Sequence, residues 1–138
     1  MSSTPPLGRS ELQVPRLGVG AMTWGAPSGL SRLTPAKLAD GGAEGAEEEA
    51  RAFEASLAAG VTLFDTAAMY SNGASERRLG ELAHGTSALI ATKFPPRMRS
   101  TAEDMPCALE ASLGRLRRLP PGGMRRRGQR SGCPRWRR

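Results

Sequence analysis

Several features that define specialised protein classes are missing from the 138-residue sequence. No apolar run reaches the length of a transmembrane helix, and the opening residues, MSSTPPLGRSELQVP, lack the apolar segment of a signal peptide. Cys107 and Cys133 form no CxxC motif and no cluster with the single histidine. We therefore expect a cytoplasmic protein outside the membrane, with no disulfide framework and no metal site.

Acidic residues are absent from the C-terminal end of the chain. Residues 1–114 hold 10 Lys+Arg and 13 Asp+Glu, a net charge of −3, whereas residues 115–138 hold 10 arginines and no acid, a net charge of +10. We predict a folded domain over residues 1–116 and a disordered basic tail over residues 117–138, because the tail is rich in Arg, Gly and Pro and lacks apolar periodicity. A GC-rich reading frame entered out of register, through a frameshift or splicing, would also produce such a tail.

Short apolar segments alternate with amphipathic segments between residues 17 and 116. The predicted strands are LGVGAMTWG (17–25), VTLFDTA (61–67) and SALIATKF (87–94), and ELQVP could add a small hairpin strand. They carry few charges, as strands buried on both faces do. With the helices between them, the order βαβαβα predicts an α/β fold with a parallel sheet and the helices outside it.

Three helices are expected from apolar spacing. The first contains Ala46, Ala50, Phe53 and Leu57, and Gly60 is a suitable C-cap. The second follows SNGASE and carries Leu79, Leu82 and Ala83. The third follows Thr101 and Asp104, which have capping-box spacing, and carries Leu109, Leu113 and Leu116.

Three polar residues fall where predicted strands end: Asp65, Tyr70 (the only tyrosine) and Lys93. Functional groups of parallel α/β folds gather at this edge of the sheet. A phenol donates a proton poorly at neutral pH unless its anion is stabilised, and a lysine ammonium held by an aspartate would stabilise it. Taken singly, Asp65 could equally cap a turn and Tyr70 could be a packing residue. Lys93 is harder to explain without a partner, because it follows a buried strand.

A dinucleotide-binding fingerprint is only partly present. Gly18 and Gly20 match the first two glycines of GxGxxG, but Thr23 occupies the third position. A Rossmann fold is therefore a weak interpretation of this segment.

Together these segments resemble the N-terminal part of the aldo-keto reductases, over roughly residues 7–116. LGRSELQVPRLGVGAMTWG is similar to the bottom hairpin and first strand of that family. FDTAAMYSNGASERRLGE is similar to its FDTA…Y…G.SE..LG segment, and LIATKF to its third strand. The resemblance implies the first three βα units of a (β/α)8 TIM barrel, truncated and therefore incomplete.

The resemblance also implies roles for individual residues. Tyr70 would be the proton donor, Lys93 would stabilise its anion and Asp65 would pair with Lys93. The cofactor would be NADP(H) and the substrate a small carbonyl compound. The cofactor-binding residues would be Gly20, Ala21, Met22 and Asp65, with Trp24 near the substrate mouth.

The chain also departs from the family pattern. The family's fourth catalytic residue is a histidine at the end of the fourth strand, whereas His84 lies at the end of the second predicted helix, where a surface position is expected. The cofactor groups of strands four to eight have no counterpart, so we expect the chain alone to be inactive. Two other functions stay open: binding of a polyanion by the basic tail, with nucleic acid not favoured, and pairing through the open sheet edges.

Overall fold

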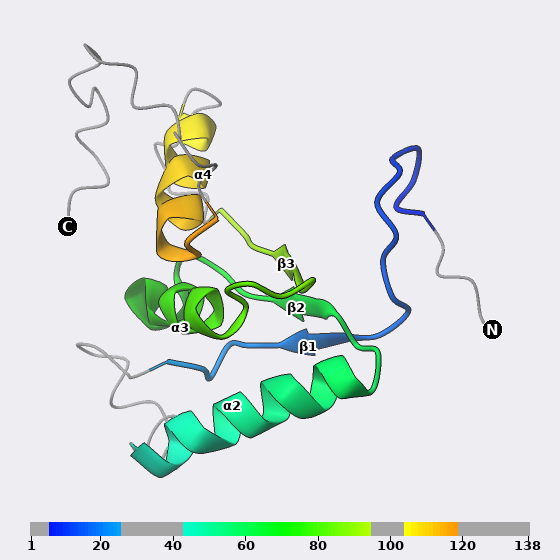
Figure 1. The fold of residues 1–138 in the computed structure, drawn as a ribbon. Coiled ribbons are helices and arrows are strands. Elements are labelled where there is room, and N and C mark those ends of the chain that lie inside the picture. The colour runs from blue at the N-terminus through cyan, green and yellow to red at the C-terminus, as the bar shows by residue number, and fades with distance from the viewer. Residues whose placement is uncertain (1–5, 26–42, 95–103, 119–138) are drawn as a thin grey trace.

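The computed structural model describes residues 6–25, 43–94 and 104–118 (Figure 1). Along the chain these residues form β1 (Gly18–Gly20), α2 (Ala43–Ala58), β2 (Leu63–Asp65), the 3-10 helix η2 (Tyr70–Gly73), α3 (Ala74–Leu82), β3 (Leu89–Ala91) and α4 (Asp104–Arg115). The predicted α/β order is confirmed. Most of the predicted basic tail and the predicted cap at Thr101 lie outside the described residues.

The three strands form one parallel sheet in the order β1-β2-β3. The paired positions across the sheet are Gly18–Leu63–Leu89, Val19–Phe64–Ile90 and Gly20–Asp65–Ala91. Each strand is shorter than its apolar segment, but backbone pairing continues past the strand ends. The amide of Thr66 donates to the carbonyl of Ala91 at 2.9 Å, and the amide of Ala68 donates to the carbonyl of Lys93 at 3.3 Å. The strand ends are therefore held side by side.

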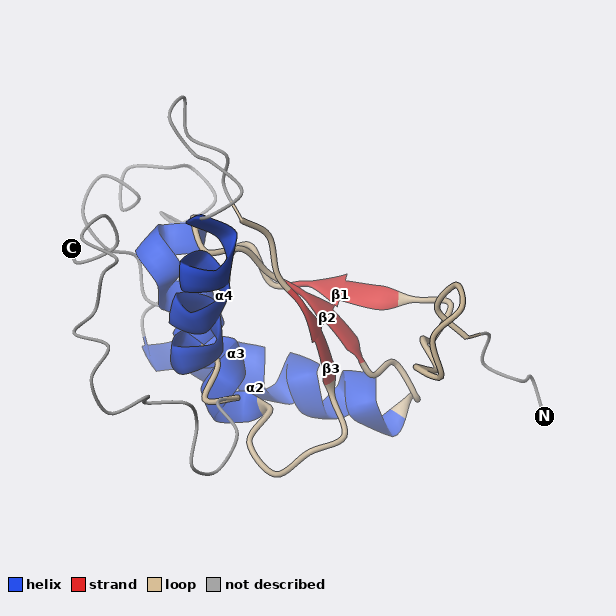
Figure 2. Ribbon diagram, turned by 90° about the horizontal axis from the view of Figure 1, so that it is seen from above, coloured by secondary structure: helices blue, strands red, loops and turns tan. Residues whose placement is uncertain are grey.

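The core lies between one face of the sheet and the helices. Phe64 of β2 is fully buried, with its ring centroid 4.7 Å from that of Phe53 of α2 and 6.0 Å from that of Trp24. The core cluster also includes Ala21, Leu79, Ala83, Ala88 and Leu116. Figures 1 and 2 show α2, α3 and α4 on the same side of the three strands. Alternation along the strands explains this arrangement, because Val19, Phe64 and Ile90 share one face.

The other face of the sheet carries Gly18, Gly20, Leu63, Asp65, Leu89 and Ala91. These residues are half-buried or exposed, and no described helix covers them (Figure 2). Strand ends and side chains on this face are thus accessible within the described part of the chain.

Helix α2 ends as the sequence predicts. Gly60 has a φ of 78°, in the left-handed region that favours glycine, and its amide donates to the carbonyl of Leu57 at 3.0 Å. This C-cap turns the chain directly into β2.

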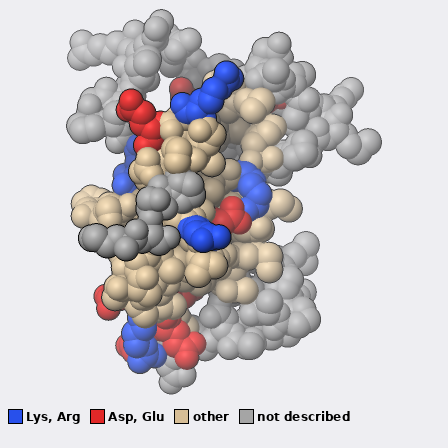
Figure 3. All heavy atoms as spheres, turned by 90° about the vertical axis from the view of Figure 1, so that its right-hand side faces the viewer, with Lys and Arg blue, Asp and Glu red and all other residues tan. Residues whose placement is uncertain are grey.

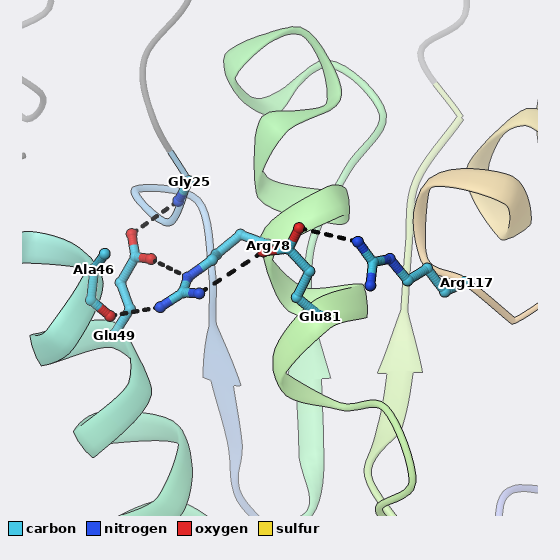
Figure 4. A network of polar contacts seen from close by, with 6 residues as sticks. All are labelled: Gly25, Ala46, Glu49, Arg78, Glu81 and Arg117. Carbon is cyan, nitrogen blue, oxygen red and sulfur yellow. Dashed lines mark hydrogen bonds and ion pairs between the residues drawn. The ribbon is translucent and has the colours of Figure 1, made fainter. Parts of the chain in front are cut away.

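A polar network joins α2, α3 and the turn after β1 (Figure 4). The buried Glu49 carboxylate accepts hydrogen bonds from the Gly25 amide and from Arg78 Nε, both at 2.8 Å. Arg78 also donates to the Ala46 carbonyl at 2.5 Å. Glu81 lies 3.8 Å from Arg78 and 3.2 Å from Arg117. The network therefore continues to the chain that follows α4.

Of the three leucines that suggested helix α4, only Leu116 belongs to the stripe through which the helix packs. Its buried residues are Ala108 and Ser112, followed by Leu116 just past its end, whereas Leu109 is 54% exposed. Small residues let α4 approach α3 closely, so they and not Leu109 face the core. Cys107 is disulfide-bonded, whereas the cysteine spacing in the sequence indicated no disulfide framework.

The described N-terminal residues form only a small part of the expected hairpin. Pro6 and Gln13 make one antiparallel bridge, and the amide of Leu7 donates to the carbonyl of Leu12 at 2.8 Å. Across the described ranges, no helix is long and apolar enough to cross a membrane.

Candidate active site

The three polar residues predicted at the strand ends lie together. Asp65 is the last residue of β2, Lys93 follows β3 by two residues and Tyr70 begins η2. Lys93 Nζ donates a hydrogen bond to Asp65 Oδ2 at 2.5 Å. The same nitrogen lies 5.3 Å from the centroid of the Tyr70 ring. The parallel sheet brings these groups together because the carboxyl ends of its strands meet at one edge.

The ion pair is open to solvent. The side chains of Lys93 and Asp65 are 50% and 47% exposed. The pKa of the Lys93 ammonium is raised, mainly because the Asp65 carboxylate accepts its hydrogen bond. Burial opposes the increase, while the charges of Asp65 and Tyr70 add to it. Lys93 therefore keeps its positive charge beside the phenol over the neutral range.

An unusual backbone turn places Tyr70 near this pair. Ser71 and Asn72 have φ values of 48° and 54°, and Gly73, the N-cap of α3, has a φ of 80°. Glycine and asparagine accept left-handed φ values readily, but serine does so less often. The sequence signal for this turn is the Asn-Gly pair. Backbone strain of this kind concentrates at functional sites.

The residues expected to bind cofactor differ in accessibility. Gly20 is exposed, pairs in register with Asp65, and has no atom within 4 Å of where a Cβ would lie. Met22 is 55% exposed. Ala21, in contrast, is fully buried, and its amide donates to the Asp65 carbonyl at 2.8 Å. Gly20, Met22 and Asp65 leave room for a bound group, whereas Ala21 belongs to the core.

Two other expectations concern Trp24 and His84. Trp24 is 7% exposed and packs in the core against Phe53 and Phe64, and its place near the substrate mouth stays a prediction. An apolar ring is more stable buried against α2 than left at the open edge. His84 is exposed just after α3, as expected.

Sequence reasoning missed a buried polar layer behind the strand ends. Thr66, Ser75 and Glu76 are each fully buried, although all three are polar. Their signal in the sequence is the Ser-Glu pair after the Asn-Gly turn. The sequence predicts only that a helix begins at this pair, and it does not indicate that the two side chains contact the sheet.

The described arginines after position 114 have partners within the fold. Arg115 pairs with Glu76 and Arg117 with Glu81, while Arg118 donates to the carbonyls of Ala83 and Ala88. On the face seen in Figure 3, basic and acidic side chains of the described residues are interspersed among uncharged ones. The other arginines of the basic tail lie outside the described residues, so polyanion binding by the tail stays a hypothesis.

The profile of the Aldo/keto reductase family matches residues 16–120. The chain belongs to this family. The match spans all three strands and the strand-end residues Asp65, Tyr70 and Lys93. The expected family is therefore confirmed.

Solved structures agree with the assignment. A Pseudomonas aeruginosa protein named for the same family is 30% identical, with a TM-score of 0.62 over 83% of this chain and 43% of its own. An aldo-keto reductase from Klebsiella pneumoniae in complex with NADPH is 27% identical, with a TM-score of 0.55 over 77% of this chain and 32% of its own. The holo form of an aldo-keto reductase from Bacillus halodurans, at 23% identity, shares the fold with a TM-score of 0.61 over 85% of this chain and 37% of its own.

The chain thus spans less than half the length of each of these solved relatives. Its parallel strands and helices match the N-terminal part of the aldo-keto reductase barrel, as predicted.

Proposed function

We propose that this chain supplies the Asp65, Tyr70 and Lys93 part of an NADPH-dependent carbonyl reductase site. The observation that carries the proposal is the contact of Lys93 Nζ with Asp65 Oδ2 at 2.5 Å, beside the Tyr70 ring. Family membership and the NADPH complex of the Klebsiella pneumoniae relative support it. The substrate class is a small carbonyl compound.

Each residue has a separate task in the proposed reaction. The Tyr70 hydroxyl donates its proton to the carbonyl oxygen, which becomes the hydroxyl of the product alcohol. The Lys93 ammonium stabilises the phenolate that remains, and Asp65 keeps that ammonium charged and oriented. NADPH, when bound, supplies the hydride that reduces the carbonyl carbon. Gly20 and Met22 lie at the open edge where they could contact it.

We further propose that the chain by itself turns over little or no substrate. The solved relatives extend well beyond the part that this chain matches. Without that part, one face of the sheet and the strand-end residues remain accessible to water within the described ranges. Water competes with the phenol for the reacting oxygen and weakens the electrostatic contribution of Lys93.

A chimaera tests the proposal. Residues 16–116 replace the matching part of the Klebsiella pneumoniae reductase, and NADPH-dependent reduction of a small aldehyde is measured, with the intact reductase as positive control. Tyr70→Phe should lower kcat by about 10²–10⁴-fold while NADPH affinity stays unchanged, because only the donated proton is lost. A folded, NADPH-binding chimaera that reduces nothing would contradict the proposal. Equal rates with Tyr70 and Phe would contradict it as well.

A further inference from the structure

The first turn of α3 reaches two strand ends through Ser75. Ser75 Oγ donates to the carbonyl of Ala21 at 2.5 Å and lies 2.8 Å from Thr66 Oγ1. A serine hydroxyl can donate only one hydrogen bond, and that of Ser75 goes to the Ala21 carbonyl. The hydrogen bond between the two hydroxyl groups is therefore donated by Thr66. Ser75 and Thr66 are both fully buried. One hydroxyl group therefore ties the residue after β1 to the residue after β2.

The neighbouring Glu76 reaches the third strand end. Its fully buried carboxylate accepts a hydrogen bond from Thr92 Oγ1 at 2.7 Å and one from Arg115 Nε at 2.5 Å. A buried carboxylate is costly unless it is paired, and Arg115 supplies the countercharge. Glu76, which accepts the hydrogen bond from Thr92, is therefore held both by α3, to which it belongs, and by Arg115 of α4.

The strand residues held by α3 adjoin the residues of the candidate active site. Ala21 follows Gly20, Thr66 follows Asp65 and Thr92 precedes Lys93. Successive residues of an extended strand project to opposite faces. Contacts on the helix side of Thr66 and Thr92 thus fix the backbone from which Asp65 and Lys93 project to the open side.

Backbone hydrogen bonds connect these held points across the sheet. The Ala21 amide donates to the Asp65 carbonyl at 2.8 Å, and the Ala68 amide donates to the Lys93 carbonyl at 3.3 Å. A shift of one strand end would therefore change the separation of Asp65 and Lys93. Their hydrogen bond is sensitive to such a shift, because both side chains are half-exposed.

We propose that Ser75 and Glu76 are positioning residues, which hold the three strand ends at the spacing where Lys93 and Asp65 meet. This inference rests on the proposed function, in which that pair keeps Lys93 charged beside Tyr70. A purely structural role for the two residues would lower the stability of the fold without altering the pair in molecules that remain folded. The state of the Lys93 ammonium separates the two roles.

The experiment uses the full 138-residue chain. Its only lysines are Lys37 and Lys93, so isotope-labelled lysine gives two ammonium signals that can be titrated by NMR, and Lys93→Arg assigns them. Asp65→Asn provides the reference for a broken pair. Of the described residues, Asp65 from β2 and Tyr70 from η2 are the titratable groups that act on Lys93.

Thr92→Val removes the hydroxyl that donates to Glu76 and keeps the branched shape of the side chain. It should lower the pKa of Lys93 by a substantial part of the decrease that Asp65→Asn produces. Thr92→Ser, which keeps the hydroxyl, should restore the pKa. Thr86→Val is the matched control, because the Thr86 hydroxyl donates to the Ala83 carbonyl at 2.9 Å beyond the opposite end of β3. It should leave the pKa unchanged.

The two hypotheses fail in distinguishable ways. If Asp65→Asn leaves the pKa of Lys93 unchanged, the pair behind the proposed function is absent in solution. If Asp65→Asn lowers the pKa but Thr92→Val does not, the positioning role is overturned and the proposed function stands. Should Thr92→Val fail to fold, as judged by circular dichroism, Ser75→Ala takes its place and must lower the pKa for the inference to survive.

Discussion

Gly80 of α3 lies directly against the backbone of Leu116: a Cβ atom on Gly80 would come within 2.6 Å of the Leu116 carbonyl carbon. Real Cβ atoms essentially never approach another atom closer than 3.0 Å. The missing side chain therefore lets the chain at the end of α4 touch α3. Arg115 precedes Leu116, so the same approach brings its guanidinium to the buried carboxylate of Glu76.

The first prediction concerns this close approach. Gly80→Ala should destabilise the fold by about 1–3 kcal/mol, because neither backbone can move away without disrupting packing. Gly114→Ala is the matched control in α4, where a Cβ would have no neighbour within 4 Å. The control should stabilise the fold by about 0.5–1 kcal/mol through helix propensity. Urea denaturation measures both changes, and equal effects of the two substitutions would refute the prediction.

The second prediction concerns the network of Figure 4. Glu49→Gln should cost about 1–3 kcal/mol, because a buried carboxylate that accepts from Gly25 and Arg78 becomes a neutral amide. Glu48→Gln makes the same chemical change at an exposed position of α2 and should change stability by less than about 0.5 kcal/mol. Thermal unfolding of the two variants gives the comparison. A loss of similar size at both positions would mean that helix propensity, and not the network, is responsible.

The order of elements and the three strand-end residues could be predicted because both follow from local patterns. Apolar runs and helical spacing identify β2, α2 and β3, and a parallel sheet brings the residues after its strands to one edge. Asp65 and Lys93 could therefore be placed near each other before their contact was known. Their roles in catalysis stay predictions.

Contacts between distant residues could not be predicted in this way. Leu109 was misplaced, because helical spacing alone does not show which side of a helix meets the core. The partners of Ser75 and Glu76, namely Thr66, Thr92 and Arg115, come from other segments of the chain. Only the packing of α3 between the sheet and α4 brings them together.

The third prediction separates backbone strain from a steric clash. Gly25 and Gly60 have φ values of 83° and 78°, but only at Gly25 would a Cβ meet the Ala74 carbonyl oxygen, at 2.5 Å. Gly60→Ala should cost about 1–2 kcal/mol for the left-handed backbone alone. Gly25→Ala should cost clearly more, since the turn after β1 must move away from α3. Chemical denaturation of both variants tests the order, and the prediction fails if Gly60→Ala is the more damaging.

The fourth prediction concerns alkaline pH. The pKa of Lys93 is raised in the folded chain, chiefly by its hydrogen bond to Asp65, so the folded state binds that proton more tightly than the unfolded state does. The resulting stabilisation is fully present below the ordinary lysine pKa and is lost as pH rises through the raised value. Asp65→Asn removes it at every pH. The difference in unfolding free energy between wild type and Asp65→Asn should therefore stay constant from neutral pH to the ordinary lysine pKa and shrink above it.

Salt provides an internal check on that difference, because a half-exposed ion pair is screened by mobile ions. Adding salt at neutral pH should reduce the difference between wild type and Asp65→Asn without abolishing the fold. The measurement is urea denaturation at a series of pH values and at two salt concentrations. A difference that is insensitive to both pH and salt would show that Asp65 stabilises the chain through its turn and not through Lys93. The Asp65–Lys93 pair would then no longer explain why a cation stays beside Tyr70.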